Sequence, residues 1–436
     1  MMLAAQILVV VAALIIGARW GSVGIGFAGG AGVLLLGALG TPVKAEDIPF
    51  DVIGIIMAVI AAISAMQRAG GMDYLVHLAE RLLRRNPKRV TTLAPLVTWS
   101  MTVLAGTGHT AFSTLPVIVE VSKEGGVRPS RPLSISVVAS QMAITASPIS
   151  AAVVFMASVL EPRGVGYLQL LAVVIPATLL AVIVTSFLVQ RLGPELDDDP
   201  VYKQRLADGL VKPPQGAASF EAPRGAKASV VIFLAAILVV MVYATMISDQ
   251  LGLIKDPALP RNEAIMAIML ATAGLIVAVA KIPAAEVPGT QVFKSGMSAC
   301  VCVMGVAWLG TTLVNAHIDG IKSTAGDLLT QWPWLLAVIL FFASALLYSQ
   351  AATAKAMIPA ALAVGVSPLT AVASFAAVSA LFVLPTYPTL LAAVEMDDTG
   401  STRLGKYVVD HPFFIPGTVC IALAVVFGFA IGAVVL

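Results

Sequence analysis

Long apolar stretches separated by short polar segments run along almost the whole chain. About 20 apolar residues in a helix, at 1.5 Å each, cross the hydrocarbon core of a bilayer. An N-terminal stretch at 2–17 is shorter and still suffices for a helix at the edge of a bundle. The stretches of full length are 22–40, 51–69, 166–190, 228–249, 263–281, 295–317 and 413–435. This pattern predicts an all-α polytopic membrane protein.

The composition points to the same class. Hydrophobic residues make up 59% of the 436 residues and charged residues 11%, whereas soluble domains carry about 25% charged residues. A water-soluble globule is therefore excluded. A formal net charge of +2 gives no reason to expect a nucleic-acid partner. The three cysteines stand in apolar runs and are expected to be reduced core thiols.

One long polar segment, 191–227, divides the chain into the halves 1–190 and 228–436. Lys and Arg concentrate in the cytoplasmic loops of membrane proteins. Two basic loops lie in the first half and consist of Arg81, Arg84, Arg85, Lys88 and Arg89, and of Lys123, Arg128 and Arg131. Counting crossings from these loops places the linker in the cytoplasm and both chain ends in the periplasm.

The N-terminal run has no Lys or Arg before it, so we expect a retained span and not a cleaved signal peptide.

The segment at about 90–122 lies between the two basic loops and must enter and leave the membrane on one side. It is too short for two crossings, which need about 40 residues, and Gly106-Thr107-Gly108-His109-Thr110 interrupts its middle. We interpret it as a re-entrant hairpin. A second hairpin is expected at about 335–364, interrupted at Tyr348-Ser349-Gln350-Ala351-Ala352-Thr353 and opening on the outer side.

Each hairpin is followed by a long apolar stretch with a proline near its middle. The stretch 133–160 is broken at Ala146-Ser147-Pro148, and the stretch 366–396 is broken at Leu384-Pro385-Thr386-Tyr387-Pro388. Proline removes a backbone donor and clashes with the preceding helical turn, so both stretches are predicted to be discontinuous helices. Five crossings per half make the halves antiparallel. Such an inverted repeat is typical of secondary transporters, with the site at the midplane between the repeats.

Several of these motifs together resemble the anaerobic C4-dicarboxylate transporter (Dcu) family of bacteria. They are Arg84-Arg85-Asn86-Pro87-Lys88, Gly106-Thr107-Gly108-His109, Arg128-Pro129-Ser130-Arg131-Pro132, Ser349-Gln350-Ala351-Ala352 and Leu384-Pro385-Thr386-Tyr387-Pro388. The resemblance extends from Gly17-Ala18-Arg19 to His411-Pro412-Phe413-Phe414. Within the family, the pair Ala354-Lys355 looks more like the general, aspartate-accepting branch than the branch specialised for fumarate and succinate. The resemblance implies exchange or uptake of fumarate, succinate, malate and aspartate across the bacterial inner membrane. It also implies kinship with the wider ion-transporter superfamily, whose members are commonly dimers in which a hairpin-bearing domain moves past a scaffold. An elevator-type homodimer is therefore expected.

A C4-dicarboxylate brings two negative charges into a region of low dielectric, which is costly unless they are paired. Helix N-termini carry free N–H groups and a partial positive charge, and four are expected near the midplane, after Thr110, Thr353, Pro148 and Pro388. We therefore predict a carboxylate cradle at the tips and breaks. Its expected residues are Thr107, Gly108, His109, Thr110, Ser147, Pro148, Ser349, Gln350, Thr353, Lys355, Thr386 and Tyr387.

Three of these residues have a second interpretation. His109 either binds a carboxylate or carries a coupled proton, or it is a structural histidine. Lys355 either pairs with a carboxylate or extends its ammonium to a watery interface. Tyr387 either closes the site with its hydroxyl or caps the broken helix.

Glu80, Arg84 and Arg128 lie near the cytoplasmic mouth of the first hairpin. They are either solvated charges that set the topology, or a gate or funnel for dianions. Two alternatives fit the same sequence. One is a cation-coupled symporter for the uptake of dicarboxylates or amino acids. The other is a dicarboxylate sensor with residual transport, for which a membrane sensor kinase is the expected partner.

A channel would need a continuous polar lining, and an intramembrane enzyme would need paired catalytic groups inside the spans. The sequence has neither, and its four histidines are too scattered for a metal site. We therefore expect a transporter without metal or cofactor.

Overall fold

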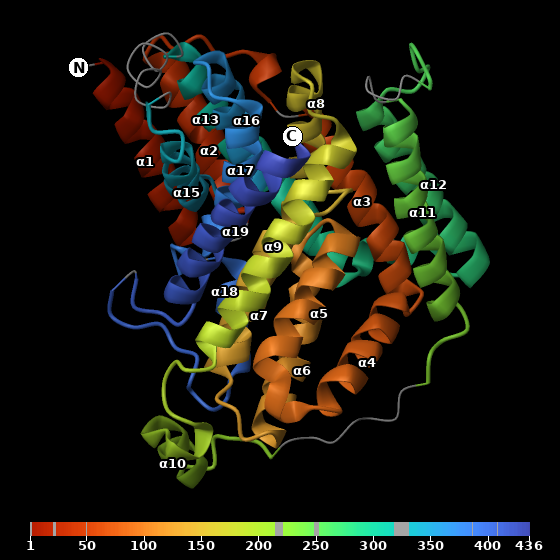
Figure 1. The fold of residues 1–436 in the computed structure, drawn as a ribbon, viewed down its shortest axis with the longest axis vertical. Coiled ribbons are helices and arrows are strands. Elements are labelled where there is room, and N and C mark those ends of the chain that lie inside the picture. The colour runs from red at the N-terminus through yellow and green to blue at the C-terminus, as the bar shows by residue number, and fades with distance from the viewer. Residues whose placement is uncertain are drawn as a thin grey trace.

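The computed structural model describes residues 2–20, 23–48, 50–213, 221–247, 253–317, 331–385, 387–407 and 409–436. Within these ranges, the side chains of residues 14, 18, 19, 25, 52, 109, 295, 299 and 314 are also outside the description. The described part of the chain is helical or irregular and holds no strand (Figure 1). The prediction of an all-α protein is confirmed.

The first half contains four helices, then a helical hairpin, then a helix broken in its middle and a last long helix. The four helices are α1 (Met2–Trp20), α2 (Gly24–Ala38), α3 (Phe50–Arg68) and α4 (Gly71–Arg84). The hairpin consists of α5 (Val90–Ala105), the 3-10 turn η3 (Gly108–Thr110) and α6 (Ala111–Glu124). The remaining helices are α7 (Ser130–Ile144), α8 (Ala151–Leu160) and α9 (Tyr167–Val189).

The linker contains two short helical pieces, η5 (Leu196–Asp198) and α10 (Pro200–Ala207). The second half then starts with α11 (Ala226–Met246), α12 (Arg261–Ala280), η6 (Ala284–Gly289) and α13 (Gln291–Ala316). Its hairpin consists of α15 (Leu335–Leu347) and α16 (Gln350–Ala363). The chain ends with α17 (Pro368–Ser374), η7 (Phe375–Phe382), α18 (Pro388–Met396) and α19 (Phe414–Val435).

Local backbone preferences explain where the hairpin arms end. Gly106 stops α5 by adopting a φ of +68°, a conformation that glycine reaches without steric cost. A Cβ at Gly106 would lie 3.0 Å from Cγ1 of Ile149, so a larger residue there would also crowd the Ile149 side chain. In the second hairpin, Tyr348 ends α15 at a φ of +53°. Ser349 then caps α16 by accepting a hydrogen bond from the Ala352 N–H at 3.2 Å.

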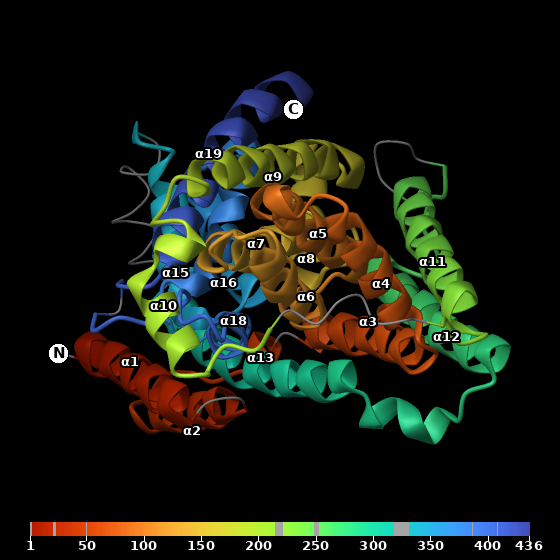
Figure 2. The same ribbon diagram turned by 90° about the horizontal axis from the view of Figure 1, so that it is seen from below.

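The helices pack reciprocally between the two halves. Helix α2 packs on α13, and α12 packs on α3, so each half supplies a helix that covers a long helix of the other. Helices α1 and α2 stand at one edge of the molecule and α11 and α12 at the opposite edge, with α13 running between them (Figures 1 and 2). Helix α9 packs on α19, and α5 packs on α7 in the same way as α15 packs on η7.

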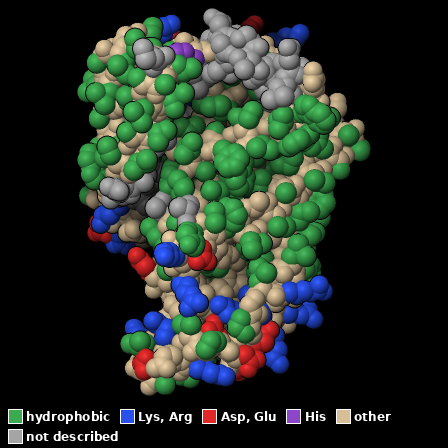
Figure 3. All heavy atoms as spheres, turned by 90° about the vertical axis from the view of Figure 1, so that its left-hand side faces the viewer, with side chains coloured by type: hydrophobic (Ala, Val, Ile, Leu, Met, Phe, Trp, Pro, Cys, Tyr) green, Lys and Arg blue, Asp and Glu red, His purple; other side chains and the backbone are tan. Residues whose placement is uncertain are grey.

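The outer surface is suited to a bilayer. Among the described residues, α9, α11, α12, α13 and α19 are long and apolar enough to cross a membrane, and α3 with α4 forms a further pair bent by 74°. Large apolar side chains such as Leu34, Val231 and Leu238 are exposed. In Figure 3, hydrophobic side chains cover a broad band, and charged side chains gather at the lower end, where α10 lies. The protein is a multi-pass membrane protein.

The structure differs from the sequence interpretation in the segment after α3. Arg81 and Arg84 belong to helix α4 and not to a loop. The helix is strongly amphipathic, with Met72, Ala79 and Leu83 buried. The apolar positions recur at helical spacing, so a helical interpretation of this basic segment was available from the sequence.

Candidate functional site

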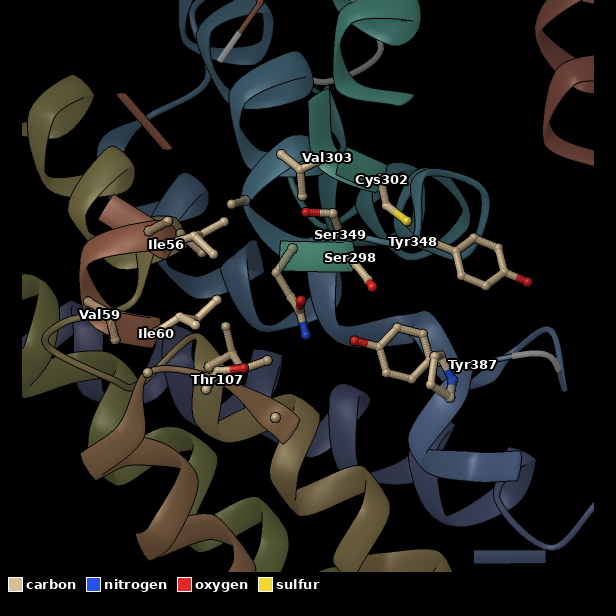
Figure 4. A pocket seen from close by; sticks show the side chains of 18 of the residues that line it. Ile56, Val59, Ile60, Thr107, Ser298, Cys302, Val303, Tyr348, Ser349 and Tyr387 are labelled. Atoms are coloured by element: carbon tan, nitrogen blue, oxygen red, sulfur yellow. The ribbon is translucent and has the colours of Figure 1, made fainter. Parts of the chain in front are cut away.

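A cavity of about 730 Å³ lies where the tips of both hairpins meet α3 and α13 (Figure 4). This volume falls within the roughly 300–1,000 Å³ typical of ligand pockets. In the close view, Thr107 lies opposite Ser349 and Ser298, and the hydroxyl of Tyr387 points into the space between them. Segments more than 200 residues apart in sequence therefore share one cavity.

Five of the predicted site residues line this cavity. Thr107 and Gly108 come from the first tip, Ser349 and Gln350 from the second, and Tyr387 from the break before α18. Gln350 is 5% exposed. Residues of both hairpin tips therefore line one cavity.

Three helices begin beside the cavity. Ala351 in the first turn of α16, Ala151 at the start of α8 and Pro388 at the start of α18 all line it. Ser150 caps α8 by accepting from the Val153 N–H at 3.2 Å. Because helix N-termini carry partial positive charge, their arrangement favours an anionic ligand.

Gln141 on α7 is a buried amide at this site that the sequence interpretation missed. Its side chain is fully buried, and its Nε2 donates to Oγ1 of Thr389 at 3.2 Å. Gln350 Nε2 donates in turn to Oε1 of Gln141 at 3.0 Å. Ser379 Oγ donates to the Gln141 carbonyl oxygen at 3.2 Å. A lone amide in an apolar helix is a costly intramembrane group, and this was the signal available in the sequence.

The opposite wall of the cavity was also missed. Helix α3 contributes an apolar surface that includes Ile56, Val59 and Ile60 (Figure 4). Helix α13 contributes polar side chains that recur at helical spacing, and α18 contributes Glu395. The α13 residues, which we call the polar stripe, are Gln291, Lys294, Ser298 and Cys302. The sequence interpretation treated 295–317 as a plain span, although the spacing of these residues marks one helix face.

Other predicted site residues are close to the cavity but do not line it. Thr110 Oγ1 lies 2.9 Å from Thr102 Oγ1, Ser147 Oγ donates to the Val103 carbonyl at 2.6 Å, and Thr353 Oγ1 donates to the Ser349 carbonyl at 2.8 Å. The Pro148 carbonyl accepts a hydrogen bond from the Tyr167 hydroxyl. These contacts hold the tips and the first break in shape.

The remaining predictions concern three further residues. Lys355 is half-buried on α16 and is not among the residues that line the cavity. The side chain of His109 and the whole of Thr386 lie outside the described residues.

The sequence comparison identifies the family. The family model described as "Anaerobic c4-dicarboxylate membrane transporter" matches residues 2–436. The chain belongs to the anaerobic C4-dicarboxylate membrane transporter family. Members of this family are transporters and not enzymes.

Named relatives match over essentially the full chain. The C4-dicarboxylate transporter DcuA of Escherichia coli K12 is 60% identical over 436 residues, which is 100% of both chains. The DcuA of Helicobacter pylori is 53% identical over 99% of both chains. The anaerobic C4-dicarboxylate transporter DcuB of Escherichia coli O6:H1 is 35% identical, also over 99% of both. Among solved structures, the Alcanivorax borkumensis YdaH transporter matches with a TM-score of 0.48 and 15% identity, covering 89% of this chain and 86% of its own.

In this member of the C4-dicarboxylate transporter family, the three predicted gate or funnel residues lie in ion pairs away from the cavity lining. Arg84 Nε donates to Glu80 Oε1 at 2.7 Å, and Arg84 also pairs with Glu124 on α6. Arg128 Nη1 lies 2.9 Å from Asp199 Oδ2 in the linker. These contacts tie α4 to the first hairpin, and the turn between α6 and α7 to the linker.

Proposed function

We propose that the protein exchanges C4-dicarboxylates, among them fumarate, succinate, malate and aspartate, across the bacterial inner membrane. The observation that carries this proposal is the meeting of two hairpin tips at one cavity with neutral donors from each. The family membership and the 60% identity to a C4-dicarboxylate transporter support the substrate class.

The chemistry of the cavity suits a short dianion. Thr107, Ser349 and Tyr387 bring hydroxyl groups, and Gln350 brings an amide. Hydrogen bonds to a charged group contribute about 1.5–3 kcal/mol each. The N-termini of α8, α16 and α18 add partial positive charge without burying a fixed counter-ion. In this proposal each tip holds one end of the substrate, and Thr110, Ser147 and Thr353 support the tips from behind.

The proposed architecture is an inverted repeat of 1–190 and 228–436 joined by the cytoplasmic linker 191–227. The reciprocal packing of α2 on α13 and of α12 on α3 supports it, because a two-fold relation between halves exchanges equivalent helices. Each half also has the same order of three long helices, a hairpin, a broken helix and a last helix, with α4 as an addition in the first half. With the linker inside, both termini lie in the periplasm.

The proposed mechanism is of the elevator type. The cavity separates the hairpins and broken helices on one side from α3 and α13 on the other. Movement of the first group past the second would carry the substrate across the membrane while the tips keep hold of it. Helices α1, α2, α11 and α12 lie behind α3 and α13, and we assign them to the scaffold of a homodimer.

Ligand-induced stabilisation of the purified protein tests the substrate class. A ligand present at about 100 times its Kd stabilises the folded state by about 2.7 kcal/mol. We expect succinate, fumarate, malate and aspartate to raise the melting temperature, and the five-carbon glutarate and the monoacid butyrate to leave it unchanged. Equal stabilisation by all six acids, or by none, would contradict the proposal.

A further inference from the structure

Lys294 is the one cationic side chain among the described residues that line the cavity. It occupies the polar stripe of α13 one turn before Ser298, on the wall that faces the hairpin tips. Within the described part of the chain, its ammonium group makes no ion pair or hydrogen bond with another side chain. Glu395 on α18 is the one carboxylate that lines the same cavity.

Lys294 lies toward the linker end of the cavity. The N-terminus of α13 is tied to the C-terminal end of α3, because the Val292 N–H donates to Oε1 of Gln67 at 3.0 Å. Glu395 lies three residues before Asp398, which accepts from Nζ of Lys123 at 3.2 Å. Eight residues separate Lys294 from Cys302, or about 12 Å along the helix axis. The cationic end of the stripe is therefore the end nearer the linker.

The charges of the side chains that line the cavity show what Lys294 contributes to binding a dianion. The described side chains of the tips supply only neutral donors to the cavity, whereas the proposed substrate carries two negative charges. Without Lys294, the charged side chain left in the described lining would be Glu395, and the cavity would repel a dianion. The lysine stem is flexible and carries its charge as a compact ammonium group. It can therefore follow a carboxylate from the linker end toward the tips.

We propose that Lys294 pairs, from the α13 wall, with one of the two substrate carboxylates that the hairpin tips hold, and that it makes the site require a second carboxylate. This inference rests on the proposed function. It assigns the discrimination between a dicarboxylate and its monoamide to a single side chain on the scaffold side of the cavity.

The test uses the purified full-length protein and compares binding of succinate with binding of succinamate, its monoamide. Lys294→Gln should reduce the preference for succinate over succinamate by about tenfold or more, since one charged contact is lost. Lys294→Arg should keep most of the preference. The matched control Lys203→Gln removes an exposed lysine on α10 and should leave the preference unchanged.

A chemical rescue makes the test independent of folding. Lys294→Cys in a Cys302→Ser background can be treated with an ethylammonium thiosulfonate or with its neutral methyl analogue. We expect the ethylammonium adduct alone to restore the preference. A preference within about twofold of wild type in Lys294→Gln, or equal rescue by both adducts, would overturn the inference. A wild-type protein that binds neither ligand would instead contradict the proposed function, and this inference with it.

Discussion

The side-chain amide of Gln350 donates to Oε1 of Gln141 at 3.0 Å, and the two residues are 209 positions apart in the chain. Gln350 opens the second arm of the second hairpin, and Gln141 lies in the broken helix of the first half. Both amides are buried. The contact joins the two halves at the cavity, so the shape of the proposed site depends on both.

Gln350→Ala is expected to weaken succinate binding by about 10- to 100-fold, because a hydrogen bond to a carboxylate is lost. Thr107→Ala, at the other tip, should weaken binding in the same direction. The protein should stay folded in both cases, as measured by its melting temperature. Gln190→Ala serves as the control, since Gln190 donates to Thr92 at 2.7 Å at an exposed position. Unchanged affinity for succinate in both tip variants would contradict the proposed carboxylate site at the hairpin tips.

Cys302 is a natural reporter of occupancy. It lines the cavity, whereas Cys300 is 6% exposed and Cys420 fully buried. Alkylation of Cys302 by a small maleimide should slow by about tenfold at a succinate concentration ten times the Kd, because about one site in eleven then stays free. The Cys302→Ser variant should lose most of the labelling. Labelling of the wild type at the same rate with and without succinate would place the substrate elsewhere.

A disulfide across the cavity boundary should stop transport. Val306 on α13 packs against Ala356 on α16 in a small buried cluster with Leu347. Val306→Cys with Ala356→Cys, once oxidised, should abolish uptake and regain it on reduction, because the elevator movement separates these helices. The control pair Gln169→Cys and Val435→Cys joins α9 to α19, which lie on the same side of the boundary. Full transport by the oxidised Val306→Cys/Ala356→Cys variant would contradict the proposed elevator movement.

Two exposed positions test the membrane orientation. Asp208 lies just after α10 in the linker, and Arg163 lies in the turn between α8 and α9, at the other end of α9. In a Cys302→Ser background, Asp208→Cys should react with a membrane-impermeant maleimide only from the cytoplasmic side, and Arg163→Cys only from the periplasmic side. Labelling of both from one side would contradict the proposed topology.

Interruptions in the apolar pattern were predictable because they are local. Gly106 and Pro148 end helices through their own backbone properties, so the tips and breaks could be located along the chain. The rotation of each helix about its axis is not local. Gln141 and Lys294 lie inside α7 and α13 and not at a break, and only tertiary packing decides that Gln141 meets Gln350 and that Lys294 lines the cavity. The same reason explains why Ser147 and Thr353 satisfy backbone carbonyls and do not line the site.

Exchange is the central claim, and counterflow in proteoliposomes tests it most directly. Uptake of labelled succinate would be compared between vesicles preloaded with fumarate, preloaded with aspartate, or left empty, with and without sodium and a pH gradient. We predict rapid uptake only into vesicles that contain a C4-dicarboxylate, whatever the ion gradient. Equal uptake into empty vesicles driven by sodium or protons would contradict exchange and would identify the protein as a cation-coupled symporter.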